Sequence, residues 1–278
     1  MHPIEHLRYV ARSGAAEHRV LVEETAAALA GMADDVAGLV MSCRRLIERN
    51  PASGPLWTLC ARALCAADPR AEAWAVVEEV TADPTARHLA LHLPAEARIT
   101  VLGWPEVAAE ALPGRGDVTV LVVDTRGGGH ALARHLARAD VEATAVDEAA
   151  TAAAVLSSDV VVIEADVLGA DGAVAAVGSR AAAAVAAHAG VPVWCVAGAG
   201  RALPQRTWDV VVARLAAISA ERPWDAEHDI VPLDLVDVVF GPGGAGPISD
   251  AQGRADGPVA PELLKEPVGR VAPGHDLR

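Results

Sequence analysis

The chain has 278 residues, of which 52% are hydrophobic and 22% are charged, so it is long and apolar enough to build a sizeable core. Its formal charge of −14, with arginines scattered along the chain, excludes the basic surface by which proteins usually bind nucleic acid. The sequence has no apolar run of about 18 residues and no signal-peptide pattern, so we expect no membrane span and a cytoplasmic protein.

Apolar side chains recur at helical spacing through the first third of the chain. The pattern predicts helices over residues 18–33, 34–50 and 56–67, and a fourth helix that begins at Pro69. Asp68 is the expected N-cap of this fourth helix, because its side chain can accept hydrogen bonds from the first free N–H groups. We therefore expect a helical domain over residues 1–97.

From Arg98 onward, short β-branched runs alternate with alanine-rich stretches. The expected strands cover residues 98–102, 117–123, 142–146, 159–164, 192–197 and 236–240, and the expected helices cover 106–112, 130–139, 149–156 and 178–188. Continuous apolar strands that alternate with helices are typical of an α/β fold with a Rossmann-like parallel sheet covered on both faces. The predicted α/β domain spans residues 98–245. The Gly- and Pro-rich residues 246–278 are expected to be mostly a flexible tail, with a short docked piece around residues 261–265 as the alternative for that part.

A run of three glycines joins the second expected strand to the next helix, in the sequence TRGGG. Gly127, Gly128 and Gly129 would expose backbone N–H groups at the helix start, and Arg126 lies beside them. Such a start suits a phosphate group. The alternative is a tight turn without a ligand, because the pattern is neither GxGxxG nor a P-loop.

Two acids, Glu164 and Asp166, follow the apolar run over residues 160–163. Ligands of open α/β sheets bind where the carboxyl ends of strands meet loops, so these side chains are candidates for a ligand site. The alternative is that Asp166 caps the following turn and Glu164 is solvated.

The four cysteines form no CxxC or CxxH pair, so we expect no metal site, and we expect no cofactor. Cys195 lies inside an apolar strand and is expected to be a core residue rather than a nucleophile. No Ser-His-Asp arrangement and no GxSxG motif is recognisable among the remaining residues.

The ordered set of motifs over residues 118–204 resembles the alpha/beta/delta family of translation initiation factor 2B. The matching segments are VVDTRGGGHALARHL, the run from Ala143 through DVVVIEAD, the DG turn and the VGS helix start, and GVP before the next strand. LIERNPASGPLW upstream and HDIVPLDLVDVVFGPGG downstream extend the resemblance over most of residues 40–245. The family includes regulatory subunits and two sugar-phosphate isomerases, which act on methylthioribose 1-phosphate and ribose 1,5-bisphosphate. The resemblance implies a cytoplasmic homodimer.

The chain departs from the isomerases of this family at most of the positions that carry their chemistry. They have a cysteine in the loop after the first strand, where this chain has Gly103 and Trp104. They have Asn-Lys before the VGT helix start, where this chain has Ala175 and Ala176. Asp166 matches their catalytic aspartate, so it is the one catalytic residue that the resemblance implies if the protein is an enzyme.

Two functions follow from these observations. The first is a regulatory or non-catalytic protein that binds a phosphorylated sugar or nucleotide. The second is a divergent aldose-ketose isomerase in which Asp166 has a new acid/base partner; a role in translation is a third alternative. The expected ligand contacts are Arg126, Gly127, Gly128, Gly129, Gly103, Trp104, Glu164 and Arg201.

Overall fold

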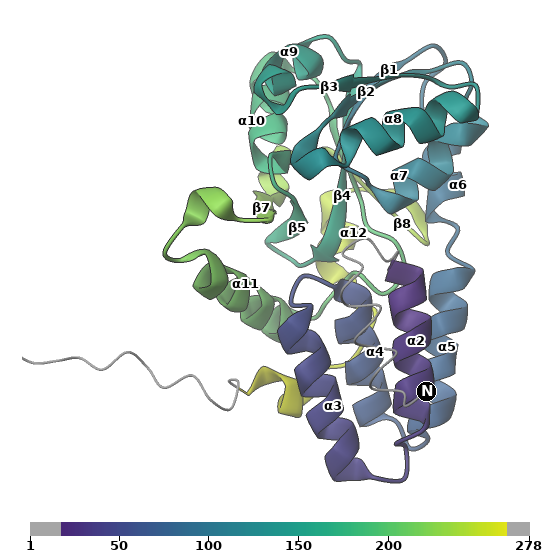
Figure 1. The fold of residues 1–278 in the computed structure, drawn as a ribbon, viewed down its shortest axis with the longest axis vertical. Helices are drawn as coiled ribbons and strands as arrows, with labels where there is room; N and C mark the ends of the chain where they lie inside the picture. The colour runs from purple at the N-terminus through teal and green to yellow at the C-terminus, as the bar shows by residue number, and fades with distance from the viewer. Residues whose placement is uncertain (1–17, 266–278) are drawn as a thin grey trace, which may run out of the picture.

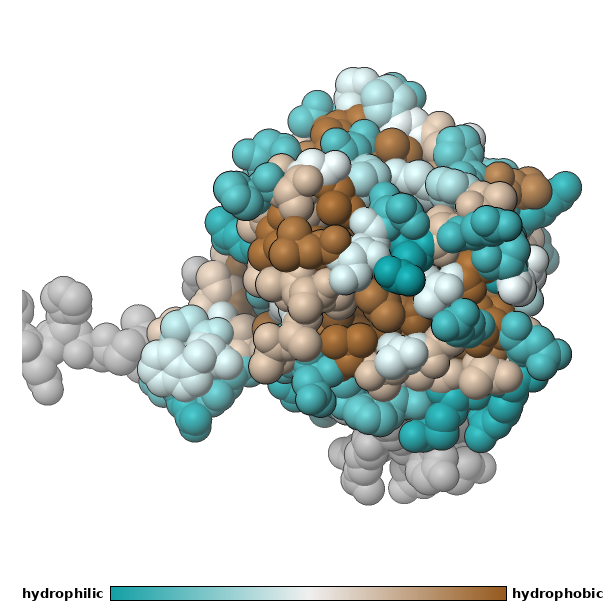
Figure 2. Space-filling view, turned by 90° about the horizontal axis from the view of Figure 1, so that it is seen from above, coloured by the Kyte–Doolittle hydropathy of each residue, from teal (hydrophilic) through white to brown (hydrophobic). Residues whose placement is uncertain are grey.

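The structure, a computed structural model, describes residues 18–265. It has a lower group of helices, α2 to α5, beneath a twisted sheet with helices on both of its faces (Figure 1). Figure 2 looks onto the sheet end from above, where brown apolar areas lie among teal hydrophilic side chains.

The N-terminal third is helical, as its periodicity predicts. The helices are α2 (His18–Ala30), α3 (Val36–Arg49), α4 (Gly54–Cys65), α5 (Pro69–Thr81) and α6 (Thr85–His92), of which only α6 has no counterpart in the sequence prediction. The predicted N-cap of α5 is confirmed: Asp68 Oδ1 accepts hydrogen bonds from the N–H groups of Arg70 and Ala71, both at 3.0 Å.

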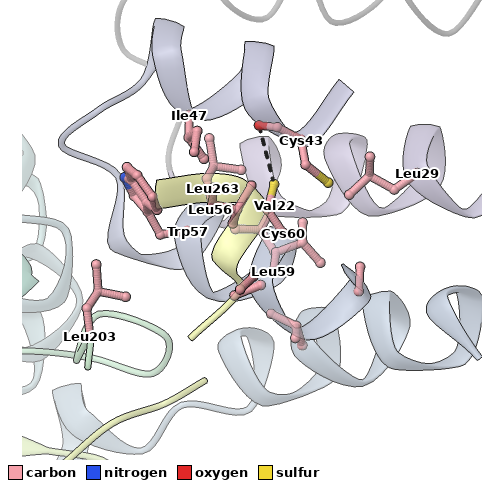
Figure 3. Close-up of a cluster of buried hydrophobic side chains, with 14 of the residues drawn as sticks. Val22, Leu29, Cys43, Ile47, Leu56, Trp57, Leu59, Cys60, Leu203 and Leu263 are labelled. Carbon is pink, nitrogen blue, oxygen red and sulfur yellow. Dashed lines mark hydrogen bonds between the residues drawn. The ribbon is translucent and has the colours of Figure 1, made fainter. Parts of the chain in front are cut away.

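The lower helices pack around a shared apolar cluster, part of which is drawn in Figure 3. Leu39, Cys43 and Ile47 recur at a spacing of four residues along α3, so all three face the cluster and are buried. Trp57 on α4 is also fully buried, and its indole N–H donates to the Pro51 carbonyl at 3.0 Å. Burying Trp57 and satisfying its single polar group fixes how α4 sits against the preceding loop.

The sheet has the order β3-β2-β1-β4-β6-β8-β9. Its strands are β1 (Arg98–Leu102), β2 (Thr119–Val123), β3 (Glu142–Val146), β4 (Val160–Leu168), β6 (Val193–Val196), β8 (Val238–Gly241) and β9 (Gly244–Gly246), with β5 (Gly172–Ala176) and β7 (His228–Pro232) beside the second half of β4. The six predicted strands are confirmed, and they pair in parallel.

The strands that the sequence did not predict, β5, β7 and β9, all pair antiparallel. β4 continues past the parallel region with a register shift between Ala165 and Val167, and its extension pairs with β5. Gly169 donates to the carbonyl of Gly172 at 2.9 Å in the turn between the two strands. β5 reads GAVAA, and its alanines favour helix over strand, so only pairing with β4 and β7 makes it extended.

Alternate residues of the central strands point to opposite faces of the sheet, as strand geometry requires. Val160 and Val162 of β4 contribute to the core beneath α6, α7 (Glu106–Ala111) and α8 (Gly129–Arg138). Val161 and Ile163 contribute to the opposite core, beneath α9 (Thr151–Leu156) and α10 (Ser179–Ala189). β4 is therefore apolar on both sides, which explains its continuous run of β-branched residues.

The last described segment includes a docked piece at the position that the sequence suggested for one, around residues 261–265. After α11 (Gln205–Ser219) and the strands β7 to β9, the chain forms α12 (Ile248–Gly253) and a short 3-10 turn, η6 (Pro261–Leu264). Asp256 anchors this segment, because its N–H donates to the Ala202 carbonyl at 2.8 Å and its carboxylate accepts from Ala202 N–H at 3.1 Å. Leu263 is then buried in the lower helical cluster (Figure 3), while residues 266–278 lie outside the described part.

Candidate functional site

The carboxyl edge of the parallel sheet lies where the lower helices meet the α/β part, and several predicted residues gather there. Trp104 follows β1, Glu164 and Asp166 lie in the second half of β4, and Arg201 follows β6. Three residues that the sequence analysis did not select, His18, Glu106 and His228, complete the group.

Glu164 caps a helix inside the protein. Its Oε1 accepts from the N–H of Glu106 at 3.0 Å, and its Oε2 accepts from the N–H groups of Val107 at 2.8 Å and Ala108 at 3.3 Å. Arg201 Nη1 lies 2.9 Å from Glu164 Oε1, and both side chains are buried. Burial raises the pKa of Glu164, whereas the Arg201 guanidinium opposes that rise. Both oxygens of this carboxylate are therefore engaged in contacts that hold α7 against β4.

Arg201 is the buried cation behind the site. Its Nη1 also donates to the Ala165 carbonyl at 2.9 Å, and its Nη2 donates to Glu106 Oε2 at 3.4 Å. Only 4% of the residue is exposed. The guanidinium therefore balances the charge of neighbouring carboxylates, and little of it is accessible to a ligand.

His18, at the start of α2, joins the lower helices to α7. Its backbone N–H donates to Glu106 Oε1 at 2.8 Å, and its ring Nδ1 lies 3.1 Å from the same oxygen. Burial opposes protonation of His18, but the Glu106 carboxylate outweighs it and raises the pKa of the imidazole. Burial likewise opposes ionisation of Glu106, but His18 and then Arg201 lower its pKa to about 2.

Asp166 is the carboxylate of this group that has no capping role. Its Oδ1 lies 3.9 Å from His18 Nε2 and 3.9 Å from Arg201 Nη1, and its Oδ2 lies 3.7 Å from His228 Nε2. These separations exceed hydrogen-bond length. With 23% of its side chain exposed, Asp166 lies among two imidazoles and a guanidinium and keeps oxygen atoms free for another donor.

Asp166 lies between two hollows. The Asp166 pocket, of about 110 Å³, is also lined by His18, Leu102, Trp104, Pro105, Glu106, Ile163, Glu164, Ala176 and Ser179. The large cleft, of about 930 Å³, lies between the end of α3, α11 and the start of β7, and its polar lining includes His18, Arg49, Ser53, Ser219, Arg222 and His228. Ala176 therefore lies on the same pocket as Asp166.

The glycine turn after β2 is not on either hollow. Asp124 occupies the start of α8, because its Oδ1 accepts from the N–H of Gly129 at 2.7 Å and from that of His130 at 3.2 Å. Arg126, in a left-handed conformation with φ of 52°, points its guanidinium to Glu227 at 2.6 Å, and both side chains are more than half exposed. The Asp124 carboxylate thus accepts hydrogen bonds from N–H groups that were expected to be available to a phosphate.

The start of α10 is occupied in the same way. Asp229 Oδ2 accepts from the N–H of Gly178 at 2.9 Å and from that of Arg180 at 3.0 Å. With Glu164 on α7 and Asp124 on α8, all three of these helix starts hold an internal carboxylate. Because helix starts attract anions, these carboxylates compete directly with any phosphate that approaches the edge.

The loop of Gly103 and Trp104 lies against the glycine turn. Gly103 has φ of 65°, and a Cβ added at Gly128 would lie 3.2 Å from both the Gly103 carbonyl carbon and the Trp104 nitrogen. This close backbone approach needs a glycine at position 128. Glycines 103 and 128 thus position Trp104, which is 41% exposed beside the Asp166 pocket.

None of the cysteines lines the Asp166 pocket or the large cleft. Cys195 is fully buried in β6, and burial raises the pKa of its thiol to about 12, so it is a core residue. Among residues 18–265, no group of three or more His, Cys, Asp or Glu side chains is arranged to hold a metal ion. Within the same range, no helix is long and apolar enough to cross a membrane.

The sequence model of the initiation factor 2 subunit family matches residues 92–245, more than half of the chain. No curated protein sequence matches the chain. Among solved structures, the Pyrococcus horikoshii translation initiation factor eIF-2B superposes with a TM-score of 0.74 at 14% identity, covering 87% of this chain and 96% of that one. A tetrameric eIF2B-beta2-delta2 complex from C. thermophilum gives a TM-score of 0.71 at 17% identity, covering 90% and 92%. The A. fulgidus eIF-2B delta subunit gives 0.59 at 16% identity, covering 89% and 91%.

Proposed function

This chain belongs to the initiation factor 2 subunit family, and on that premise we propose that it binds a phosphorylated sugar or nucleotide at Asp166 without converting it. The observation that carries the proposal is the division between the two acids of β4. Glu164 is buried and accepts three backbone hydrogen bonds, whereas Asp166 accepts none from residues 18–265 and opens onto two hollows. A carboxylate in this position suits ligand hydroxyl groups, which can only donate to it.

The phosphate of such a ligand can meet basic side chains in the large cleft rather than helix starts, although Glu48, Glu221, Asp225 and Glu227 also line this cleft. His18 and His228 flank Asp166, and Arg49 and Arg222 lie further along the cleft. Arg222 already pairs with Asp225 at 2.7 Å. Guanidinium and imidazolium groups both make charge-assisted hydrogen bonds to phosphate oxygens.

The absence of conversion rests on the residues around Asp166. Aldose-ketose isomerisation moves protons between neighbouring carbons and oxygens, so it needs acid and base groups on both sides of the reacting atoms. Ala176 presents a methyl group to the Asp166 pocket, Gly103 and Trp104 supply no thiol, and Cys195 is buried. The expected result is binding with absent or slow turnover.

A divergent isomerase is the second candidate, and one observation favours it. The imidazoles of His228 and His18 lie 3.7 Å and 3.9 Å from the two oxygens of Asp166. Histidines transfer protons near neutral pH and can replace other acid/base groups. Turnover of ribose 1,5-bisphosphate or methylthioribose 1-phosphate that is lost in Asp166→Asn would establish this function.

We also propose a homodimer formed mainly through the α/β part. That end of the molecule exposes apolar areas (Figure 2), and Leu156 on α9 is 63% exposed. Exposed apolar surface is commonly covered by a partner, and identical subunits usually pair about a two-fold axis. Light scattering at micromolar concentration should give twice the mass of one chain, and a monomer mass would refute the dimer.

Calorimetric titration with ribose 5-phosphate tests the binding function. We expect the wild type to bind, and Asp166→Asn to weaken binding at least about tenfold, as expected when a charged hydrogen-bond acceptor is neutralised. Asp147→Asn is the matched control, because Asp147 is an exposed aspartate that follows β3 and lines neither the Asp166 pocket nor the large cleft. Equal affinity in the wild type and Asp166→Asn would remove Asp166 from the site.

A further inference from the structure

The described residues end beside α11, where Arg214 holds the backbone of the chain. Arg214 Nη2 donates to the Leu263 carbonyl at 2.9 Å and to the Lys265 carbonyl at 3.3 Å. The same guanidinium lies over the Trp57 ring, 4.9 Å from its centroid. Because Trp57 is fully buried in the lower helical cluster, these contacts fix the point on α11 from which residues 266–278 continue.

The other terminal nitrogen of Arg214, Nη1, is buried but has no hydrogen-bond partner among residues 18–265. Burial lowers the pKa of Arg214, and the nearby Glu48 carboxylate opposes that change without accepting a hydrogen bond from Nη1. A buried N–H group without an acceptor costs free energy. The next residue of the chain, Glu266, carries a carboxylate that can supply this acceptor.

Arg214, Ile218 and Glu221 form one stripe along the second half of α11, which we call the α11 stripe. Positions i, i+4 and i+7 lie on the same side of a helix, and Ala220 keeps helical dihedral angles (φ −57°, ψ −39°), so Glu221 continues the stripe. Ile218 is 60% exposed. Glu221 makes no ion pair with residues 18–265, since its neighbour Arg222 pairs with Asp225 instead. The stripe thus presents a cation, an apolar side chain and an anion in turn.

Residues 266–270 read EPVGR, which is the complementary order of an acid, an apolar side chain and a base. Along α11, Ile218 lies about 6 Å beyond Arg214, and Glu221 about 10 Å beyond it. In an extended or polyproline chain, Val268 lies about 6 to 7 Å beyond Glu266, and Arg270 about 13 Å beyond it. A proline at position 267 favours such an extended chain. The two sets of spacings differ by less than the length of an arginine side chain, so all three pairs can form together.

We propose that residues 266–270 dock along the α11 stripe, with Glu266 on Arg214, Val268 on Ile218 and Arg270 on Glu221. The apolar contact removes Ile218 from water, and the two charge pairs fix the direction and register of the segment. Ile218 and Glu221 also line the large cleft, so the docked segment lies along the rim that α11 contributes and narrows the opening of this cleft. The docking does not depend on the function proposed for Asp166, and its test uses no ligand.

Disulfide cross-linking in the full chain, with diamide as the oxidant, tests the register. Every variant carries Cys65→Ser, because Cys65 is an exposed thiol near Glu262 and would compete for the cross-link. We expect Ile218→Cys with Val268→Cys to cross-link at least about tenfold faster than Ala213→Cys with Val268→Cys, because docking raises the effective concentration of one thiol at the other. Ala213 is the matched control: it is also exposed on α11 and adjoins Arg214, but it lies about 100° round the helix from it.

Charge reversal tests the pair at the end of the stripe. Glu221→Lys should slow the cross-link between positions 218 and 268 about two- to fivefold, as for loss of an exposed ion pair, and adding Arg270→Glu should restore the rate. Asp147→Lys, which makes the same charge change at an exposed position after β3, should leave the rate unchanged. No cross-link at position 218, or equal rates at positions 218 and 213, overturns the docking. A rate that responds to neither charge reversal overturns the proposed register.

Discussion

Glu164 and Asp166 lie two residues apart on β4, yet the structure gives them different roles. Both were expected at a strand end, but β4 continues to Leu168 and both lie within it. Glu164 faces three N–H groups of α7, whereas Asp166 faces two imidazoles. The sequence could predict the pair because an apolar run precedes it. It could not predict which of the two acids caps a helix, because α7 lies 58 residues earlier in the chain and only folding brings it to β4.

The first prediction separates these roles by stability. Glu164→Gln should lower the free energy of unfolding by about 3 kcal/mol, because it leaves the buried Arg201 without its closest carboxylate. Asp166→Asn should change it by less than about 0.5 kcal/mol, as for a partly exposed side chain without a hydrogen bond. Urea unfolding measures both, and a larger loss in Asp166→Asn than in Glu164→Gln would contradict the assignment of Glu164 as the cap.

The second prediction concerns the pH dependence of the His18–Glu106 contact. The pKa of His18 is raised in the folded state, so its stabilisation is complete below the unfolded pKa of about 6.5 and is lost as pH rises through the folded pKa. The pKa of Glu106 is lowered to about 2, so its stabilisation is present above its unfolded pKa and is lost only as pH falls toward 2. The contact should be strongest near pH 5.5.

His18→Gln should therefore destabilise the protein by about 1 to 2 kcal/mol at pH 5.5 and by less at pH 9. Asp166 and Arg201 also face the ring, and they are unchanged in this variant. His188→Gln, at an exposed position on α10, is the control and should cost less than about 0.5 kcal/mol at either pH. If the loss of unfolding free energy in His18→Gln increased with pH, it would contradict a raised pKa of His18 in the folded state.

At the scale of elements, carboxylates from the sheet and its loops cap the helices that begin at its carboxyl edge. At the start of α8 the sequence left open a phosphate site or a turn without a ligand, and in the structure Asp124, five residues before Gly129, accepts a hydrogen bond from the Gly129 N–H. This cap could have been predicted from the sequence VVDTRGGG, because aspartate is a common acceptor for the free N–H groups at a helix start. The cap of α10 was not predictable in this way, because Asp229 follows Gly178 by 51 residues.

The third prediction tests this capping. Asp124→Ala should lower the free energy of unfolding by about 1 kcal/mol, because the N–H groups of Gly129 and His130 lose their acceptor. Asp147→Ala is the control: Asp147 follows β3 as Asp124 follows β2, but its side chain makes no capping bond. Equal losses in the two variants, measured by thermal or urea unfolding, would mean that Asp124 does not act as a cap.

For the whole molecule, the alternation of apolar runs with helices was sufficient to predict an α/β fold that follows a helical region. The sequence also suggested a docked piece around residues 261–265, but not that this piece packs on the lower helices. Residues 246–265 contain many glycines and prolines, but Leu263 is buried against helices that lie some 200 residues earlier in the chain. The composition of a segment does not show whether one of its leucines is buried, because that burial depends on the surface against which the segment packs.

The fourth prediction concerns this segment. Leu263→Ala should lower the free energy of unfolding by about 2 to 4 kcal/mol, as for other buried leucines that leave a cavity. Leu264→Ala, at the adjacent half-buried position, is the control and should cost less. A negligible loss in Leu263→Ala, measured by urea unfolding, would show that the segment contributes little to the stability of the lower helices.

The central claim is that Asp166 holds a phosphorylated ligand that the protein does not convert. Phosphorus-31 NMR of ribose 1,5-bisphosphate, mixed with the wild type and with Asp166→Asn, tests binding and conversion in one measurement. The account predicts that the wild type broadens or shifts the ligand resonances, that Asp166→Asn leaves them as in free solution, and that no new resonance grows with time. Resonances of a ketose product that accumulate with the wild type, and not with Asp166→Asn, would contradict the account and identify an isomerase.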